Sequence, residues 1–223
     1  RTAEFYRSIL ADRLATRFNL QPPGMLWKTA NALTGEGGTR HSGDFWNCAK
    51  WGARTDDLAQ DNSQVEDCFP AAERNKRTLV VLTIGGNDIA SLQKDGRTRT
   101  YEQNLEAVAR FVNLLREAVH MLKDRARFPG GVDVVFANMF EFTDGTGDVG
   151  SCPAATVGGF TEPWDNPLDL ERLVIWANEQ FMAVAVEARA DMIFMLEHFC
   201  GHGYRNDDPA GRCYRGPNAE RWF

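Results

Sequence analysis

The sequence predicts an α/β protein with a central parallel sheet and helices on both faces. Short apolar runs rich in β-branched residues indicate buried strands, and they alternate with longer segments whose apolar residues recur at helical spacing. This alternation is typical of parallel sheets whose strands are connected by helices. With 223 residues, the chain is long enough for one domain. We therefore expect a single three-layer α/β/α sandwich over residues 1–223.

The expected elements follow in the order helix, loop, strand, helix, strand, loop, helix, strand. Apolar residues from Phe5 to Phe18 keep helical spacing and predict a first helix over residues 2–19. Residues 20–77 are rich in Gly, Asn, Asp, Trp and Pro, and we expect a long functional loop there. The predicted strands are Leu79–Ile84, Val132–Phe140 and Asp191–Leu196, and the later helices are Tyr101–Lys123 and Leu168–Arg189.

The segments after the strands are the expected ligand-binding region. Ligands of such sheets bind beyond the carboxyl ends of the strands. Three segments occupy these positions: Gly85–Ala90, Glu141–Gly159 and Glu197–Cys213.

Composition excludes two classes of function. The net charge is −6, from 31 acidic and 25 basic residues, whereas nucleic-acid surfaces need clustered Lys and Arg. The longest apolar runs are far shorter than the ~20 residues of a membrane-spanning helix. We expect neither a nucleic-acid partner nor a transmembrane segment.

The five cysteines favour disulfides over a metal site. None of them forms a C-x-x-C pair, so a zinc ribbon has no support. Cys48 with Cys68, and Cys200 with Cys213, each bracket a loop rich in polar and turn residues. We interpret both as disulfides, which predicts a secreted or otherwise extracytoplasmic protein. The alternative is that all five are buried thiols, and the odd Cys152 needs a partner outside this sequence.

A strand that ends in two glycines and an amide is the first functional signal. In "TLVVLTIGGNDIA" the apolar run stops at Gly85 and Gly86, which permit a sharp turn and a close approach to the backbone. Asn87 then presents a side-chain N–H donor, which suits a developing negative oxygen. Asp88 is available to cap the turn or to orient Asn87. A plain turn is the alternative interpretation of these four residues.

A second fragment, "NCAKWGARTDDL" at residues 47–58, strengthens the functional interpretation. Together with "VLTIGGND" it resembles the second and third sequence blocks of the SGNH hydrolases, also called the GDSL esterase/lipase family. The resemblance implies a flavodoxin-like fold and an oxyanion hole made by the Gly52 N–H and the Asn87 side chain. It also implies substrate contacts near Gly86 and at Trp51, which replaces a small residue and would reshape the acyl pocket.

The nucleophile and base of that family are missing from this sequence. The family's Ser lies in an N-terminal Gly-Asp-Ser motif and its acid and base in a C-terminal Asp-x-x-His block, and neither occurs here. The serines are Ser8, Ser42, Ser63, Ser91 and Ser151, and none follows a predicted strand directly. Ser42 adjoins His41, but sequence neighbours seldom form a dyad. Of the four histidines, His202 is the best candidate for a substrate contact, ahead of His198.

We therefore expect the single SGNH-hydrolase-like domain to lack its N-terminal Gly-Asp-Ser strand and its C-terminal Asp-x-x-His segment, supplied by a longer protein or a second chain. A degenerate homologue is the alternative. The predicted activity is serine-dependent hydrolysis of a lipid or acetylated-carbohydrate ester, with no cofactor and no metal.

Two rival functions remain open at the level of sequence. One is an inactive carbohydrate- or lipid-binding protein, whose sugar-stacking residues would be Trp27, Trp46, Trp51 and Trp164. The other is a metal-dependent phosphoesterase, because "GGND" faintly resembles the Gly-Asn-His-Asp motif of that class. That class needs several Asp, Asn and His ligands, including a D-x-H that the sequence lacks.

Overall fold

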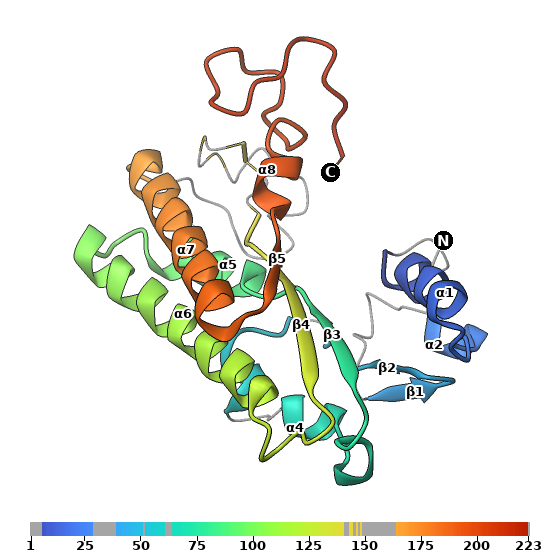
Figure 1. Cartoon of the computed structure of the whole chain (residues 1–223). Coiled ribbons are helices and arrows are strands. Elements are labelled where there is room, and N and C mark those ends of the chain that lie inside the picture. The colour runs from blue at the N-terminus through green and yellow to red at the C-terminus, as the bar shows by residue number, and fades with distance from the viewer. Residues whose placement is uncertain are drawn as a thin grey trace.

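The chain folds as an α/β protein whose helices pack against a parallel sheet (Figure 1). The computed structural model describes residues 6–28, 39–50, 52–60, 64–140, 143–144, 146, 148 and 164–222. The helices are α1 Tyr6–Phe18, α2 Met25–Lys28, α3 Asp56–Ala59, α4 Gln64–Cys68, the 3-10 turn η2 Ala71–Glu73, α5 Gly86–Asp95, α6 Tyr101–Lys123, α7 Pro167–Ala188 and α8 Met195–Phe199. The strands are β1 Arg40–Ser42, β2 Phe45–Asn47, β3 Thr78–Leu82, β4 Val132–Ala137 and β5 Asp191–Ile193.

The main sheet has three strands in the order β3-β4-β5, and both pairings are parallel. Val80 lies beside Val134 and Leu82 beside Phe136, and Phe136 in turn lies beside Met192. Neighbouring residues in a sheet project to the same face, so these side chains form one apolar surface. The three predicted strands and their parallel arrangement are confirmed, with β4 and β5 each three residues shorter than expected.

The apolar surface of the sheet is buried beneath α6 and α7, whereas the opposite surface is not covered to the same extent. On the buried side, Val134 and Phe136 are fully enclosed and join a core cluster with both helices. On the other side, Leu79 is 46% exposed and Ile193 is 44% exposed. The prediction that the first strand is buried on both faces is therefore wrong for the described residues.

The two long helices have clear sequence causes. α6 begins at a capping box, in which the Thr100 side chain accepts from the Gln103 N–H and the Gln103 side chain accepts from the Thr100 N–H. α7 begins at Pro167, whose fixed φ suits a first helical position. Phe181 of α7 meets Phe136 of the sheet edge to face, at 6.1 Å between ring centroids. The predicted bounds of both helices hold to within one residue.

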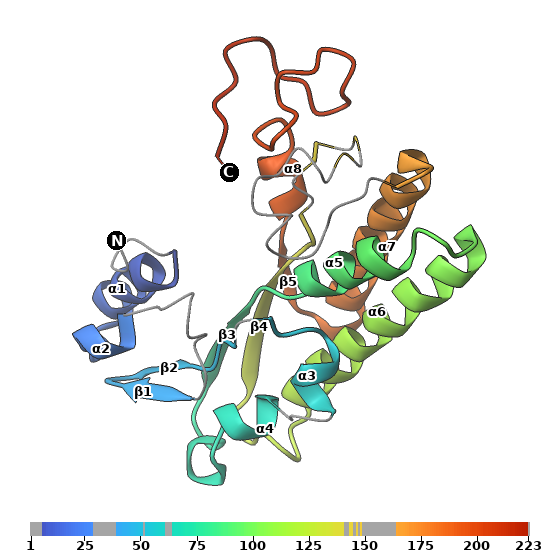
Figure 2. The ribbon, with the colours of Figure 1, turned by 180° about the vertical axis from the view of Figure 1, so that it is seen from behind.

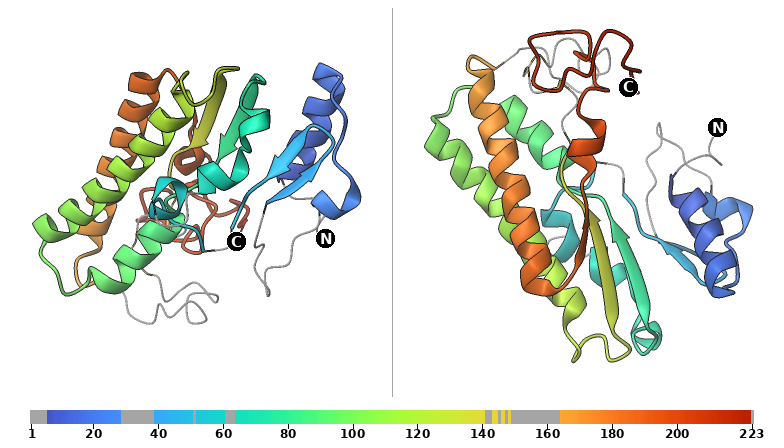
Figure 3. Two further views of the ribbon diagram at one scale, coloured as in Figure 1. Left: turned by 90° about the horizontal axis from the view of Figure 1, so that it is seen from below. Right: turned by 45° about the horizontal axis from the view of Figure 1, so that its top comes forward.

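The segment 20–77 is not a single loop. It contains the short helices α2, α3 and α4, the turn η2, and an antiparallel hairpin formed by β1 and β2. These elements are too short for periodicity to reveal. Figures 1 and 2 place α1, α2 and the hairpin together on the side of β3 that faces away from α6 and α7, and Figure 3 shows the same grouping from two further directions.

Both predicted disulfides are present. Cys48 is bonded to Cys68 and Cys200 to Cys213, with Cα atoms 5.6 Å and 5.0 Å apart. Cys152 lies outside the described residues. Among the helices of the described part, none combines the length and the apolar character that crossing a membrane requires.

Candidate oxyanion site

The carboxyl ends of β3, β4 and β5 lie at one edge of the sheet, because the strands are parallel. Side chains connect the segments beyond these ends. Asn138, directly after β4, donates to the Glu197 carboxylate at 2.8 Å and accepts from the Leu196 N–H at 2.8 Å. Both partners lie in α8, just beyond β5. Asn138, which lies just before the second predicted segment, therefore contacts Glu197, the first residue of the third predicted segment.

The turn after β3 requires a glycine. Gly85 has φ +100°, a left-handed conformation that other residues adopt with strain. A Cβ at this position would lie 2.7 Å from both Cγ and Sδ of Met139, which follows β4. Gly85 therefore lets the chain turn into α5 while the ends of β3 and β4 stay closely packed.

The turn brings Asn87 next to the loop that contains Gly52. Asn87 Nδ2 donates to the backbone oxygen of Ala53 at 2.9 Å. Gly52 itself is exposed, with φ +77° and no heavy atom within 4 Å of an added Cβ, so it is the backbone conformation that favours glycine there. Among the described residues, none accepts a hydrogen bond from the Gly52 N–H. The two predicted donors thus lie on segments joined by a direct hydrogen bond.

A second, buried contact lies behind the first. The Asp88 carboxylate accepts from the Thr55 N–H at 3.1 and 3.3 Å and from the Thr55 hydroxyl at 2.7 Å. Thr55 is completely buried and Asp88 is 9% exposed. Asp88 therefore neither caps its own turn nor orients Asn87 directly, the two roles expected from the sequence.

The ionisation of Asp88 should leave a signature in the pH dependence of stability. Burial raises the pKa of the Asp88 carboxyl above its ordinary value, and the hydrogen bonds from Thr55 oppose that shift without cancelling it. A carboxyl whose pKa is higher in the folded state contributes less to the free energy of unfolding as the pH rises through the window between its unfolded and folded pKa. We expect wild type to gain stability relative to Asp88→Asn as the pH falls through that window.

The measurement is urea denaturation of both proteins from about pH 7 down to about pH 3.5. Asn at position 88 does not titrate, so the difference between the two curves reports the carboxyl alone. A difference that moves the other way on acidification would mean that the Thr55 hydrogen bonds outweigh burial.

Asp144, which no sequence motif marks, organises the loop after α8. It is 1% exposed and has φ +54°. One carboxylate oxygen accepts from the N–H groups of Gly201 and Gly203 at 2.9 and 3.1 Å, and the other accepts from the Arg205 N–H at 3.2 Å. A buried carboxylate with several backbone donors fixes the conformation of those donors. The signal available in the sequence was the pair Asp144-Gly145 in a turn-rich stretch, which says nothing of its distant partners.

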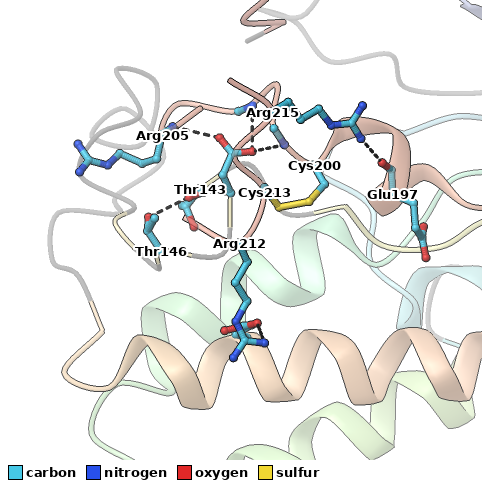
Figure 4. Close-up of a disulfide and its surroundings, with 12 residues drawn as sticks. Thr143, Thr146, Glu197, Cys200, Arg205, Arg212, Cys213 and Arg215 are labelled. Atoms are coloured by element: carbon cyan, nitrogen blue, oxygen red, sulfur yellow. Dashed lines mark hydrogen bonds and ion pairs between the residues drawn. A yellow bond between two sulfur atoms is a disulfide. The ribbon is translucent and has the colours of Figure 1, made fainter. Parts of the chain in front are cut away.

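The same loop holds the second disulfide, which Figure 4 shows, and it also contains His202. Arg215 donates to the backbone oxygen of Glu197 at 2.8 Å, which ties the loop back to α8. His202 Nδ1 lies 2.6 Å from the backbone oxygen of Glu220, and its ring stacks on Trp222 at 3.7 Å between centroids. Because a carbonyl oxygen only accepts, Nδ1 carries the proton. These contacts fit a structural role, and the substrate contact stays a prediction.

The remaining candidate residues form two groups, those that the structure describes and those that lie outside the described residues. Ser42 Oγ accepts from the Gly24 N–H at 2.8 Å, while His41 stacks on Trp46, so neighbours in β1 face different partners. Ser8 is buried in α1, and Ser91 Oγ lies 3.3 Å from Asp95 Oδ2 within α5. Gly86 is the exposed first residue of α5. Outside the described residues lie Trp51, Ser63 and Ser151.

A cavity of about 250 Å³ adjoins the Gly52 and Asn87 segments. Arg54 and Asp88, the sequence neighbours of Ala53 and Asn87, line it together with Ser91 and the side of α6. Of the tryptophans considered for sugar stacking, Trp27 and Trp164 are buried and pack within the structure. The described part of the chain contains no cluster of three or more His, Cys, Asp or Glu side chains arranged to hold a metal ion.

Comparison with known proteins gives one family match and two matching solved structures. The model of the family described as GDSL-like lipase/acylhydrolase matches residues 3–182. The crystal structure of phospholipase A1 from Streptomyces albidoflavus NA297 is 19% identical, with a TM-score of 0.40. The extracellular lipase from Streptomyces rimosus is also 19% identical, with a TM-score of 0.38. Each match covers 68% of this chain and 61% of the other, so the chain spans about three fifths of the length of these structures. No curated protein matches the chain.

Proposed function

The chain belongs to the GDSL-like lipase/acylhydrolase family, and on that premise we propose that it carries the oxyanion hole of an ester hydrolase. The observation that supports this most directly is the hydrogen bond from Asn87 Nδ2 to the Ala53 oxygen. It joins the two segments that the family resemblance assigns to the hole, although they lie 34 residues apart in the sequence.

The proposed chemistry follows from the number of donors. A side-chain amide nitrogen carries two hydrogens. In the proposal, one hydrogen of Asn87 stays on the Ala53 oxygen and fixes the plane of the amide, and the other points to the substrate. The Gly52 N–H supplies the second donor, and the exposed Gly86 lies at the edge of the same site. Donors fixed in advance stabilise an oxyanion without reorganising during the reaction.

The reaction that such a hole serves is acyl transfer through a serine. A Ser hydroxyl gives its proton to a His base while its oxygen attacks the ester carbonyl, and the carbonyl oxygen becomes the oxyanion. The tetrahedral intermediate collapses, the protonated His gives the proton to the departing alcohol, and water then releases the acid by the same steps in reverse order. We propose that the Ser and the His lie outside residues 1–223, in a further segment of the protein or in a second chain.

The sheet offers a place for such a segment. Within the described residues, β3 is an edge strand, and no strand pairs with its outer side. Leu79 and Ile193 leave apolar surface exposed on the less covered face. A further parallel strand beside β3, with a helix over that face, would complete the three-layer domain, and its end would lie at the same edge as Asn87.

The proposed setting is extracytoplasmic. Two disulfides persist only where thiols are not kept reduced. The substrate class we propose is an acyl ester of a lipid or an acetylated carbohydrate, with Trp51 shaping the acyl pocket. No cofactor takes part in this proposal.

A serine-directed fluorophosphonate tests the proposal on the complete protein. We expect stoichiometric labelling of one Ser, with parallel loss of the hydrolysis of a soluble p-nitrophenyl ester. Peptide mapping identifies the labelled residue, which we expect outside the 223 residues. A complete protein that neither reacts with the probe nor hydrolyses esters would instead support the inactive binding protein.

A further inference from the structure

We propose that the buried contact between Thr55 and Asp88 is a positioning device, which holds the two oxyanion donors at the separation that catalysis needs. The inference rests on the proposed function, because it concerns the geometry of the same hole. Neither residue is proposed to touch the substrate. Both act through their neighbours, Gly52 on one segment and Asn87 on the other.

The contact links the Gly52 loop to the first turn of α5. Thr55 follows Gly52 by three positions, and Asp88 directly follows Asn87. The carboxylate accepts from both the N–H and the hydroxyl of Thr55, at 3.1 Å and 2.7 Å for the shortest bonds. Two donors from one residue to one carboxylate fix direction as well as distance. The position of the Gly52 loop relative to the start of α5 is therefore defined at this point.

Burial makes this contact the stronger of the two that join the segments. The bond from Asn87 to the Ala53 oxygen is exposed, so water competes for both groups. Thr55 is fully buried and Asp88 is 9% exposed, so water competes far less for this contact. If only the exposed bond joined the segments, the loop could shift by a fraction of an ångström at little cost.

The chemistry of the contact indicates that it fixes the position of the Gly52 loop relative to α5, and does not merely stabilise the fold. Burying a carboxylate is unfavourable unless hydrogen bonds replace its water. An apolar pair of the same volume would fill this space with less desolvation, and would also slide more easily. Asp88 lies in the first turn of α5, where the helix dipole favours a negative charge. A directional, buried, charge-assisted contact is what a fixed donor geometry requires.

The test compares Thr55→Val with Thr55→Ser in the complete enzyme. Val keeps the shape and the N–H but removes the hydroxyl, so we expect kcat for a soluble ester to fall roughly ten-fold with KM within about two-fold. Ser keeps the hydroxyl, and we expect kcat within about three-fold of wild type. The matched control is Thr78→Val at the start of β3, at the other end of the sheet, with kcat unchanged. All assays are made well below each variant's unfolding temperature, so a purely structural role would leave kcat intact.

A double-mutant cycle with Asn87→Ala tests whether the contact acts through the hole. If it does, Thr55→Val costs less than about two-fold once Asn87 is gone. A ten-fold loss in both backgrounds, or an unchanged kcat in Thr55→Val alone, overturns the inference. Should Thr55→Val not fold, Asp88→Asn replaces it in the cycle, with an expected three- to ten-fold loss.

The cycle also separates this inference from the function on which it rests. Asn87→Ala with full activity overturns both. Asn87→Ala with a large loss, beside a Thr55→Val enzyme of wild-type kcat, overturns the positioning role alone and leaves the oxyanion assignment standing.

Discussion

Asn87→Ala is expected to lower kcat for ester hydrolysis by the complete enzyme roughly 10²- to 10³-fold, with KM nearly unchanged. The reason is that the amide hydrogen assigned to the oxyanion is used only after the carbonyl oxygen becomes negative. Substrate binding in the ground state does not depend on it. Steady-state kinetics with a soluble ester measure both constants.

Two controls make the result interpretable. Asn75→Ala changes an exposed asparagine in the turn before β3, at the opposite end of the sheet, and we expect no change in kcat. Because Asn87 is also exposed, its loss should change the free energy of unfolding by no more than about 1 kcal/mol. Equal activity of Asn87→Ala and wild type would show that the oxyanion donor lies elsewhere.

Asp144→Ala is expected to lower the free energy of unfolding by about 3 kcal/mol. The substitution leaves the N–H groups of Gly201, Gly203 and Arg205 without their acceptor. Two of these hydrogen bonds are buried, so replacement by water requires the loop after α8 to open. Urea denaturation gives the free energy, and hydrogen exchange of the three amides shows whether the loop is the part that loosens.

Asp207→Ala is the matched control for this second prediction. Asp207 lies in the same loop but is exposed, and a surface substitution of this kind usually changes stability by less than about 0.5 kcal/mol. If both alanine variants were equally stable, the Asp144 hydrogen bonds would not be what holds the loop.

The fold was predictable where local pattern and tertiary packing agree. Tyr101–Lys123 was predicted to the residue, because its apolar stripe coincides with the face that packs in the core. The hairpin of β1 and β2 was missed, because three-residue strands carry too little periodicity. The exposure of Leu79 was missed for another reason. An apolar run shows that a strand is suited to apolar contacts on both faces, but it does not show whether another element covers each face.

The sequence pointed to the donors of the proposed site but not to the residues that hold those donors in place. The glycines and Asn87 stood out because a strand end with these residues has a specific chemical use. Thr55 and Asp144 did not, because their importance comes from partners 33 and more than 50 residues away. A single sequence records which hydrogen-bonding groups exist, and only the fold decides which of them meet.

The bond between Cys48 and Cys68 has a practical consequence for experiments on this protein. The disulfide closes a loop between Cys48 and Cys68 that contains both Gly52 and Thr55. This loop is therefore held at its two ends by the disulfide, and also at Thr55 by the hydrogen bonds to Asp88 of α5. Material made in a bacterial cytoplasm would keep the two thiols reduced and would give this loop more freedom than the disulfide-bonded protein allows. For the proposed ester hydrolysis, we expect such material to give lower turnover numbers than the disulfide-bonded protein, so thiol-titrated, fully oxidised preparations are the appropriate standard for comparing variants.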